Sequence, residues 1–222
     1  MHFFKKIIHY CIATFCNTGF ILYNTYKNSM GKGMIVKMED KKTVINHDSI
    51  IDMVQIALMS AIVYVCTAFI NVPYGVGVKA VVHFGDSAVF IAAMLLGKRK
   101  AALSSAIGMS LFDILSPYAI WAPFTFLIKG IMGYIAGTIA YRKNYNGKNF
   151  WNNVFAFSCA GAWMIAAYFA AGIILNHLML NYDFVTSTVV SAAKMPADLL
   201  QVAAGIIIAL PVGHALKRAG IK

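Results

Sequence analysis

The chain has 222 residues, of which 60% are hydrophobic and only 12% are charged, and its mean hydropathy is +0.70. A water-soluble domain cannot bury that much apolar surface, so the composition indicates a polytopic membrane protein. The formal net charge is +11, but the basic residues stand in short clusters between apolar runs, which is typical of cytoplasmic loops and argues against a nucleic-acid-binding protein.

Residues 1–47 differ from the rest of the chain. The stretch 7–23 is only moderately apolar, so it makes a marginal membrane span, and it lacks a convincing signal-peptide cleavage site. The codons for GKGM at 31–34 must be purine-rich and can hold a ribosome-binding site just before Met38. We therefore expect residues 1–47 to be an N-terminal extension, either disordered or a mis-assigned start with Met38 or Met34 as the native first residue.

The remaining domain, 48–222, contains six hydrophobic segments, and about 20 residues suffice to cross a bilayer core. The second and third segments are near the lower limit of length, whereas the fifth is long enough to tilt. The sequence predicts an all-α membrane protein, a bundle of six transmembrane helices. The segments are approximately 51–70, 80–96, 101–118, 121–141, 151–180 and 192–216.

The basic clusters fall on one side of this six-span arrangement. The opposite loops carry only Lys79 and Lys194. The positive-inside rule therefore predicts that both termini are cytoplasmic, in a bacterial cell (plasma) membrane, and that the GKRK stretch at 97–100 is a cytoplasmic hairpin turn. The clustered residues are Lys41, Lys42, Lys98, Arg99, Lys100, Arg142, Lys143, Lys148, Lys217, Arg218 and Lys222.

Small residues recur four positions apart, a spacing that lets membrane helices approach closely. Packing within the chain explains most such pairs, and each pair alone is a weak indication. The pairs are Ala57 with Ala61, Ser104 with Gly108, and Gly133 with Gly137.

Ionisable and polar residues gather in the outer half of the predicted bundle, where they are energetically costly unless they face its interior or a cavity. They are His83, Asp86, Asp113, Trp121, Thr125, Lys129, Asn176, His177, Lys194, Asp198 and Gln201. We expect Lys129 and Asp198 to offset each other's charge. Two interpretations stay open: ion pairs that fix helix register beside an interfacial aromatic belt, or an outward-facing pocket for a small polar aromatic molecule.

The sequence shows no motif of enzyme chemistry. It contains no GxxxxGK[ST] loop, no HExxH and no GxSxG, and its four cysteines include no CxxC pair. We therefore predict a protein that is not an enzyme and has neither a metal site nor a cofactor.

Two long stretches resemble the substrate-binding S components of energy-coupling factor (ECF) vitamin transporters of the riboflavin type. They are VVHFGDSAVFIAAMLLGKRKAALSSAIGMSLFDIL, from residue 81, and WAPFTFLIKGIMGYIAG, from residue 121; KMPADLLQ at 194–201 is similar to the last span of that family. The resemblance covers about residues 50–217. Within it, Gly85-Asp86, Leu95-Leu96-Gly97 and Thr125 with Ile128-Lys129-Gly130 and Gly133 carry the match.

The resemblance implies a vitamin or vitamin precursor bound near the extracellular face and ATP-driven uptake with a transmembrane coupling protein and two ATPase subunits. Riboflavin, pyridoxine and hydroxymethylpyrimidine are all compatible ligands. Ala57 and Ala61 match the small-residue pair that contacts the coupling protein in the family. The expected substrate-binding residues are Asp86, Trp121, Thr125, Lys129, Asn176, Asp198 and Gln201.

A solitary secondary transporter or facilitator of a small polar solute is the alternative. In that case Asp86 and Lys129 would form an ion relay, as buried ionisable residues do in many transporters.

Overall fold

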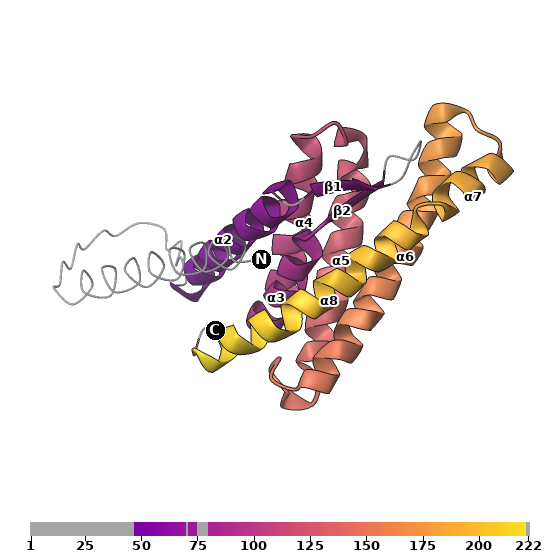
Figure 1. Ribbon diagram of the computed structural model, residues 1–222. Coiled ribbons are helices and arrows are strands. Elements are labelled where there is room, and N and C mark those ends of the chain that lie inside the picture. The colour runs from indigo at the N-terminus through magenta and orange to yellow at the C-terminus, as the bar shows by residue number, and fades with distance from the viewer. Residues whose placement is uncertain (1–46, 70, 75–79, 221–222) are drawn as a thin grey trace, which may run out of the picture. The chain divides into compact units, whose positions relative to one another are not determined.

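The structure is a computed structural model that describes residues 47–69, 71–74 and 80–220 (Figure 1). The predicted extension 1–47, except its last residue, lies outside the described residues, as do Lys41, Lys42, Lys79 and Lys222.

Seven α-helices and a short β-hairpin make up the described part of the chain. The helical class predicted from the sequence is therefore confirmed, with the hairpin added. The elements are α2 (His47–Phe69), β1 (Asn71–Tyr74), β2 (Ala80–His83), α3 (Gly85–Leu96), α4 (Lys98–Ile114), α5 (Ala122–Ala140), α6 (Phe150–Leu180), α7 (Phe184–Ala192) and α8 (Met195–Arg218), with the 3-10 helices η1 (Ala119–Trp121) and η2 (Arg142–Asn144) on either side of α5.

The second predicted segment, 80–96, is not one helix. Its first four residues form β2, which pairs antiparallel with β1, and only Gly85–Leu96 is helical. Valine-rich VVH suits a strand, whereas the following run of Ala, Met and Leu suits a helix. Hydropathy could not separate the two parts because both are apolar.

Helix α3 lies in the centre of the bundle and contacts α2, α4, α5 and α8. Val89, Phe90 and Met94 are fully buried, and the Phe90 ring stacks on Phe157 of α6 with centroids 4.5 Å apart. A helix that is apolar on all sides is one that is buried on all sides. Helix α8 covers α3 and α6, and it is the yellow helix that crosses the bundle in Figure 1.

The predicted turn at 97–100 is shorter than expected. Gly97 alone connects the two helices, with a φ of 75° that favours glycine, and Lys98 already belongs to α4. Cations at a helix N-terminus are unfavourable. Here Lys100 forms an ion pair with Asp52 and donates to the Gln55 side chain at 2.7 Å, which joins α4 to α2.

The small-residue pairs in α4 and α5 pack within the chain, as predicted. A Cβ on Gly108 would lie 2.6 Å from the Ser60 carbonyl oxygen, and a Cβ on Gly133 would lie 2.8 Å from that of Ala101. These close approaches join α2 to α4 and α4 to α5. Ala57 and Ala61, in contrast, are exposed.

The last predicted segment, 192–216, begins in a corner between two helices rather than in one span. Helix α7 ends at Ala192, and α8 begins at Met195. Asp183 caps α7 by accepting hydrogen bonds from the backbone N–H groups of Val185 and Thr186. Hydrogen bonds from Thr186 lower the pKa of this exposed carboxyl.

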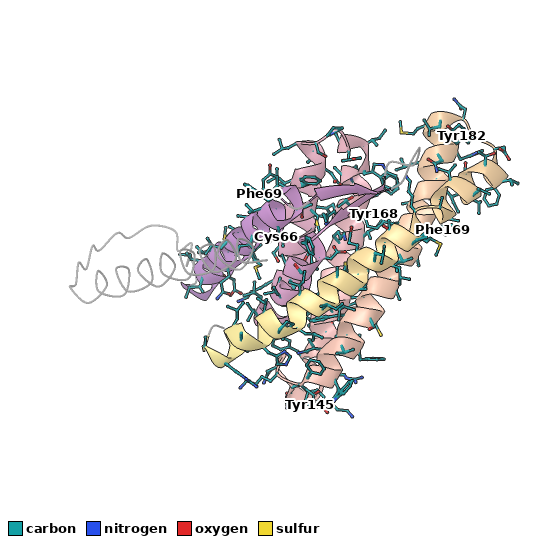
Figure 2. All side chains as sticks on the ribbon, in the orientation of Figure 1. Cys66, Phe69, Tyr145, Tyr168, Phe169 and Tyr182 are labelled. Atoms are coloured by element: carbon teal, nitrogen blue, oxygen red, sulfur yellow. The ribbon has the colours of Figure 1, made fainter. Side chains whose placement is uncertain are left out.

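Four helical stretches in the described part of the chain are long and apolar enough to cross a membrane. They are Ser49–Phe69, Ala119–Ala140, Phe150–Leu180 and Phe184–Arg218. Their outer faces carry exposed apolar side chains, such as Phe69 at the end of α2, 84% exposed (Figure 2). Large exposed apolar surfaces of this kind are what lipid covers, so the chain is a multi-pass membrane protein.

Candidate functional site

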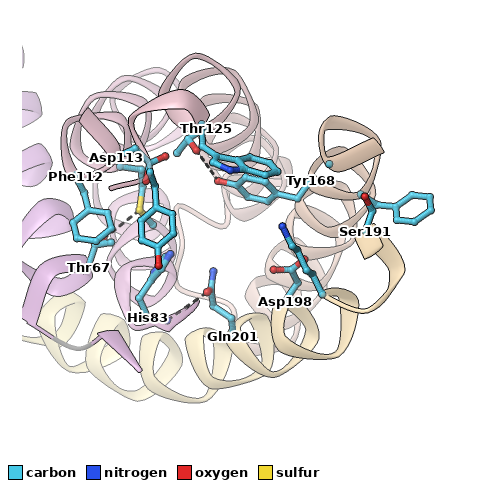
Figure 3. Close-up of a pocket in the computed structure, with 15 residues that line it drawn as sticks. Thr67, His83, Phe112, Asp113, Thr125, Tyr168, Ser191, Asp198 and Gln201 are labelled. Carbon is cyan, nitrogen blue, oxygen red and sulfur yellow. Dashed lines mark hydrogen bonds between the residues drawn. The ribbon is translucent and has the colours of Figure 1, made fainter. Parts of the chain in front are cut away.

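A cavity of about 140 Å³ opens at one end of the bundle, where the end of α4, η1, the middle of α6 and the start of α8 meet. Four of the predicted site residues line it: Trp121, Thr125, Asp198 and Gln201. In Figure 3, Thr125 and Tyr168 stand on one side of the cavity, and His83, Gln201 and Asp198 stand on the opposite side. The structure thus brings together polar residues that are far apart in the chain, such as His83 and Gln201, which are separated by 118 positions.

Asp86 and Lys129 do not line the cavity. They form an ion pair in the bundle interior, where their side chains are 0% and 1% exposed. Gln201 donates from Nε2 to the second carboxylate oxygen of Asp86 at 2.7 Å, and Lys129 Nζ also contacts the sulfur of Met164 at 2.9 Å. Four helices, α3, α5, α6 and α8, are therefore joined at one buried polar cluster.

The direct partner of Lys129 is Asp86, whereas Asp198 is influenced by the Lys129 charge without a salt bridge to it. Asp198 lies at the cavity wall without a salt bridge in the described part of the chain. Asp86 is on α3, which is buried on all sides, so its carboxylate has no access to water and needs a cation at contact distance. Asp198 is half-buried at the start of α8, where the N-terminal end of the helix favours negative charge.

Tyr168 connects the buried cluster to the cavity. Its ring lies 5.5 Å from the Lys129 ammonium, a cation–π distance, and its hydroxyl donates to Thr125 Oγ1 at 3.2 Å. On the other side, the backbone N–H of His83 donates to Gln201 Oε1 at 3.4 Å. Both amide ends of Gln201 are thus engaged by the protein.

Two aromatic rings form one wall of the cavity. The centroids of Trp121 and Tyr168 are 6.2 Å apart, with the rings inclined at 51°. The Lys194 ammonium lies 5.1 Å from the Trp121 ring. Trp121 was predicted from the sequence, but Tyr168 was missed. A tyrosine in the middle of an apolar span is itself an indication, because a buried tyrosine hydroxyl needs a partner.

Asn176 is one helical turn beyond the cavity wall. It is buried and donates from Nδ2 to Ser191 Oγ at 3.3 Å, which ties α6 to α7. Ser191 and Gly172 line the cavity, and a Cβ on Gly172 would lie 2.8 Å from Ser191 Oγ. Asn176 therefore supports the wall. His177, the next residue, is exposed.

Ala57 and Ala61 lie on an exposed face of α2. Leu58 and Val65 are 41% and 40% exposed on the same helix. In the described part of the chain, no group of three or more His, Cys, Asp or Glu is arranged to hold a metal ion.

Comparison with known proteins gives the family. The sequence profile of the family described as "ECF-type riboflavin transporter, S component" matches residues 47–218. A protein of Pyrococcus woesei, described as an "uncharacterized protein in gap 3'region", is 26% identical over 156 residues, which cover 70% of this chain and 95% of the relative.

Two solved structures share the fold. The S component for biotin from an ECF-type ABC transporter superposes with a TM-score of 0.55 at 14% identity, covering 79% of this chain and 95% of that one. A structure described as the S component of a bacterial ECF transporter gives the same TM-score at 16% identity, covering 78% and 99%. These likenesses show a common fold. Since the family profile spans more than three quarters of the sequence, the chain belongs to the S components of the ECF-type riboflavin transporter family.

Proposed function

We propose that this S component binds a water-soluble vitamin or vitamin precursor, a flat heterocycle, in the cavity and delivers it to an ATP-driven importer. The observation that carries this proposal is the cavity itself. It combines the aromatic wall of Trp121 and Tyr168 with the polar side chains of Thr125 and Asp198. Small-molecule sites have this composition, apolar and aromatic walls with a few placed polar groups.

The cavity is on the extracellular side in this proposal. Helix α4 begins with the basic residues 98–100 and reaches Asp113 near its end, and α8 runs from Asp198 in its first turn to the basic Arg218. The cavity therefore lies at the end of the bundle away from these cations. The positive-inside rule then supports cytoplasmic termini and a bacterial plasma membrane location.

Six crossings remain compatible with the short second segment. Strand β2 extends over about 13 Å and α3 over about 18 Å, together close to the ~30 Å of a bilayer core. Extended backbone is tolerated at membrane depth where protein covers it or where it borders a cavity. β2 contacts α2 and α8, and His83 at its end borders the cavity.

We assign two roles to the predicted site residues. Trp121, Thr125 and Asp198 contact the ligand directly, because their side chains line the cavity. Gln201 also lines the cavity, but both ends of its amide are bonded to the protein, so its main role is to hold the wall in position. Asp86, Lys129 and Asn176 act from behind the wall.

The exposed face of α2 with Ala57 and Ala61 is the proposed contact with a transmembrane coupling protein that works with two ATPase subunits. Small residues allow a partner helix to approach closely. Both alanines are exposed, whereas the small pairs of α4 and α5 are already used inside the chain.

The test is to identify and quantify, by mass spectrometry, the small molecules released from the purified, detergent-solubilised protein. Wild-type protein is expected to release about one heterocycle per chain, and Trp121→Ala protein to release much less. An equal amount from both proteins would contradict a site at this cavity.

The buried Asp86–Lys129 pair also fits an ion relay in a solitary facilitator. That alternative predicts uptake that persists without ATPase subunits and stops when the proton gradient is collapsed.

A further inference from the structure

We propose that the ligand has a single ring and presents hydrogen-bond donors or a positive charge to Asp113 and Asp198, so that multi-ring and anionic ligands are excluded. This inference rests on the proposed function, since it describes the ligand of the same cavity. The juxtaposition that carries it is a small cavity with one aromatic wall and two carboxylates without salt bridges.

The size of the cavity sets the first limit. It measures about 140 Å³. An engineered apolar cavity of about 150 Å³ in another protein accepts one benzene ring. One six-membered ring therefore fits beside Trp121 and Tyr168, and its substituents can extend toward the polar wall. A tricyclic ligand would exceed this volume, so part of it would lie outside the cavity.

The charge of the lining sets the second limit. Asp113 at the end of α4 and Asp198 at the start of α8 both line the cavity, and neither forms a salt bridge in the described part of the chain. Lys194 is the only lysine or arginine among the described lining residues, and its ammonium lies 5.1 Å from the Trp121 ring. Lys129, the nearest buried cation, is paired with Asp86.

The described lining thus has more carboxylates than cations. A half-buried carboxylate is stabilised by a cation or by donated hydrogen bonds, and a bound anion would be repelled. Thr125 already donates a hydrogen bond to Asp113, and Lys194 is near Asp198, but neither carboxylate has a cation at salt-bridge distance in the described part of the chain. An amino group or a protonated ring nitrogen can supply that contact.

The experiment is a binding panel on purified protein in detergent, measured by calorimetry. Pyridoxamine and pyridoxine share one ring and differ in an amino against a hydroxyl group. Pyridoxamine 5′-phosphate adds an anion, 4-amino-5-hydroxymethyl-2-methylpyrimidine changes the ring, and riboflavin adds two rings. The molecule released from the purified protein is identified by mass spectrometry beside the panel.

We expect the aminated single rings to bind about tenfold or more tightly than pyridoxine, the phosphate ester and riboflavin, which corresponds to one charge-assisted hydrogen bond. Asp113→Asn and Asp198→Asn should each reduce that preference by about tenfold. Asp52→Asn is the matched control. Asp52 pairs with Lys100 and is outside the cavity lining, so its removal should leave the preference unchanged.

A released or preferred ligand that is tricyclic or anionic would overturn the inference and leave the proposed function standing. Unchanged preference in both cavity variants would overturn it as well. If the wild-type protein releases no small molecule and binds no member of the panel, the proposed function fails with it.

Discussion

At the residue scale, the Asp86–Lys129 pair buries two opposite charges, which is energetically costly unless both are present. Both side chains are almost completely removed from solvent, and each group would be very unfavourable there alone. The hydrogen bond from Gln201 satisfies the second carboxylate oxygen. The buried charges are therefore stable only when Asp86, Lys129 and Gln201 are all present. Their contacts fix the register of α3 against α5 and α8.

Removal of one partner should destabilise the protein strongly. Lys129→Met leaves Asp86 buried without a cation, and we expect a loss of about 3–5 kcal/mol of unfolding free energy. Thermal unfolding in detergent measures this loss. The double variant Asp86→Leu/Lys129→Met should recover most of it, because replacing both charges with apolar groups removes the penalty. A double variant as unstable as the single one would contradict this account.

Tyr168 offers a separate residue-scale prediction. Tyr168→Ala removes one ring of the aromatic wall and should weaken ligand binding by about tenfold, since aromatic contacts contribute about 1 kcal/mol beyond buried area. Tyr168→Phe keeps the ring and loses only the hydrogen bond to Thr125. Calorimetry should therefore show a much smaller effect for Tyr168→Phe. Equal losses in both variants would assign the role to the hydroxyl instead.

At the element scale, glycines set the distance between α4 and α5. Gly133 and Gly130 are one turn apart on α5, but they differ in their surroundings. A Cβ at Gly133 would lie 2.8 Å from a backbone oxygen of α4, whereas at Gly130 the nearest atom is the Ala106 Cβ at 3.3 Å. The contact at Gly130 needs a shift of only a few tenths of an ångström, whereas the contact at Gly133 is too close for any Cβ and requires the backbone of α4 to move.

Gly133→Ala is accordingly expected to lower the unfolding free energy by about 1–3 kcal/mol, the range for overpacked sites. Gly130→Ala serves as the matched control on the same helix. It gains the same helix propensity but meets a milder contact, so it should cost distinctly less. Thermal unfolding of the two variants side by side is the measurement. Equal stability of both would show that α4 and α5 can separate without cost.

The elements also show what sequence could and could not predict. Segments such as 151–180 were predicted almost to the residue, because a long apolar run between polar Asn149 and Asn181 has only one interpretation. The strand–helix division at Phe84 was missed, since a buried strand and a buried helix are equally apolar.

The site residues also include some that the sequence could predict and some that it could not. Depth within a span placed Trp121, Thr125, Asp198 and Gln201 in one layer, and in the structure all four line one cavity. Depth could not reveal that Lys129 faces Asp86 and not Asp198, because the pairing depends on how α3, α5 and α8 are rotated. Tyr168 was missed because the residues around it in α6 are apolar.

At the scale of the whole molecule, binding and delivery should be separable. Ala57→Trp places a bulky group on the exposed face of α2, away from the cavity lining. Ligand binding should stay within about twofold of wild type, and uptake into cells should fall by tenfold or more because a partner helix can no longer approach closely. Ile207→Trp, at an exposed position of α8, is the control and should preserve both. Normal uptake by Ala57→Trp cells would remove the coupling role from this face.

Energy coupling is the central claim about the whole molecule, and uptake of the labelled ligand tests it most directly. Cells would express the chain with the coupling protein and ATPases, with ATPases that cannot hydrolyse ATP, or alone. We predict concentrative uptake only in the first case, with ligand binding by the chain in all three. Uptake by the chain alone that stops when the proton gradient is collapsed would contradict the account and identify a secondary transporter.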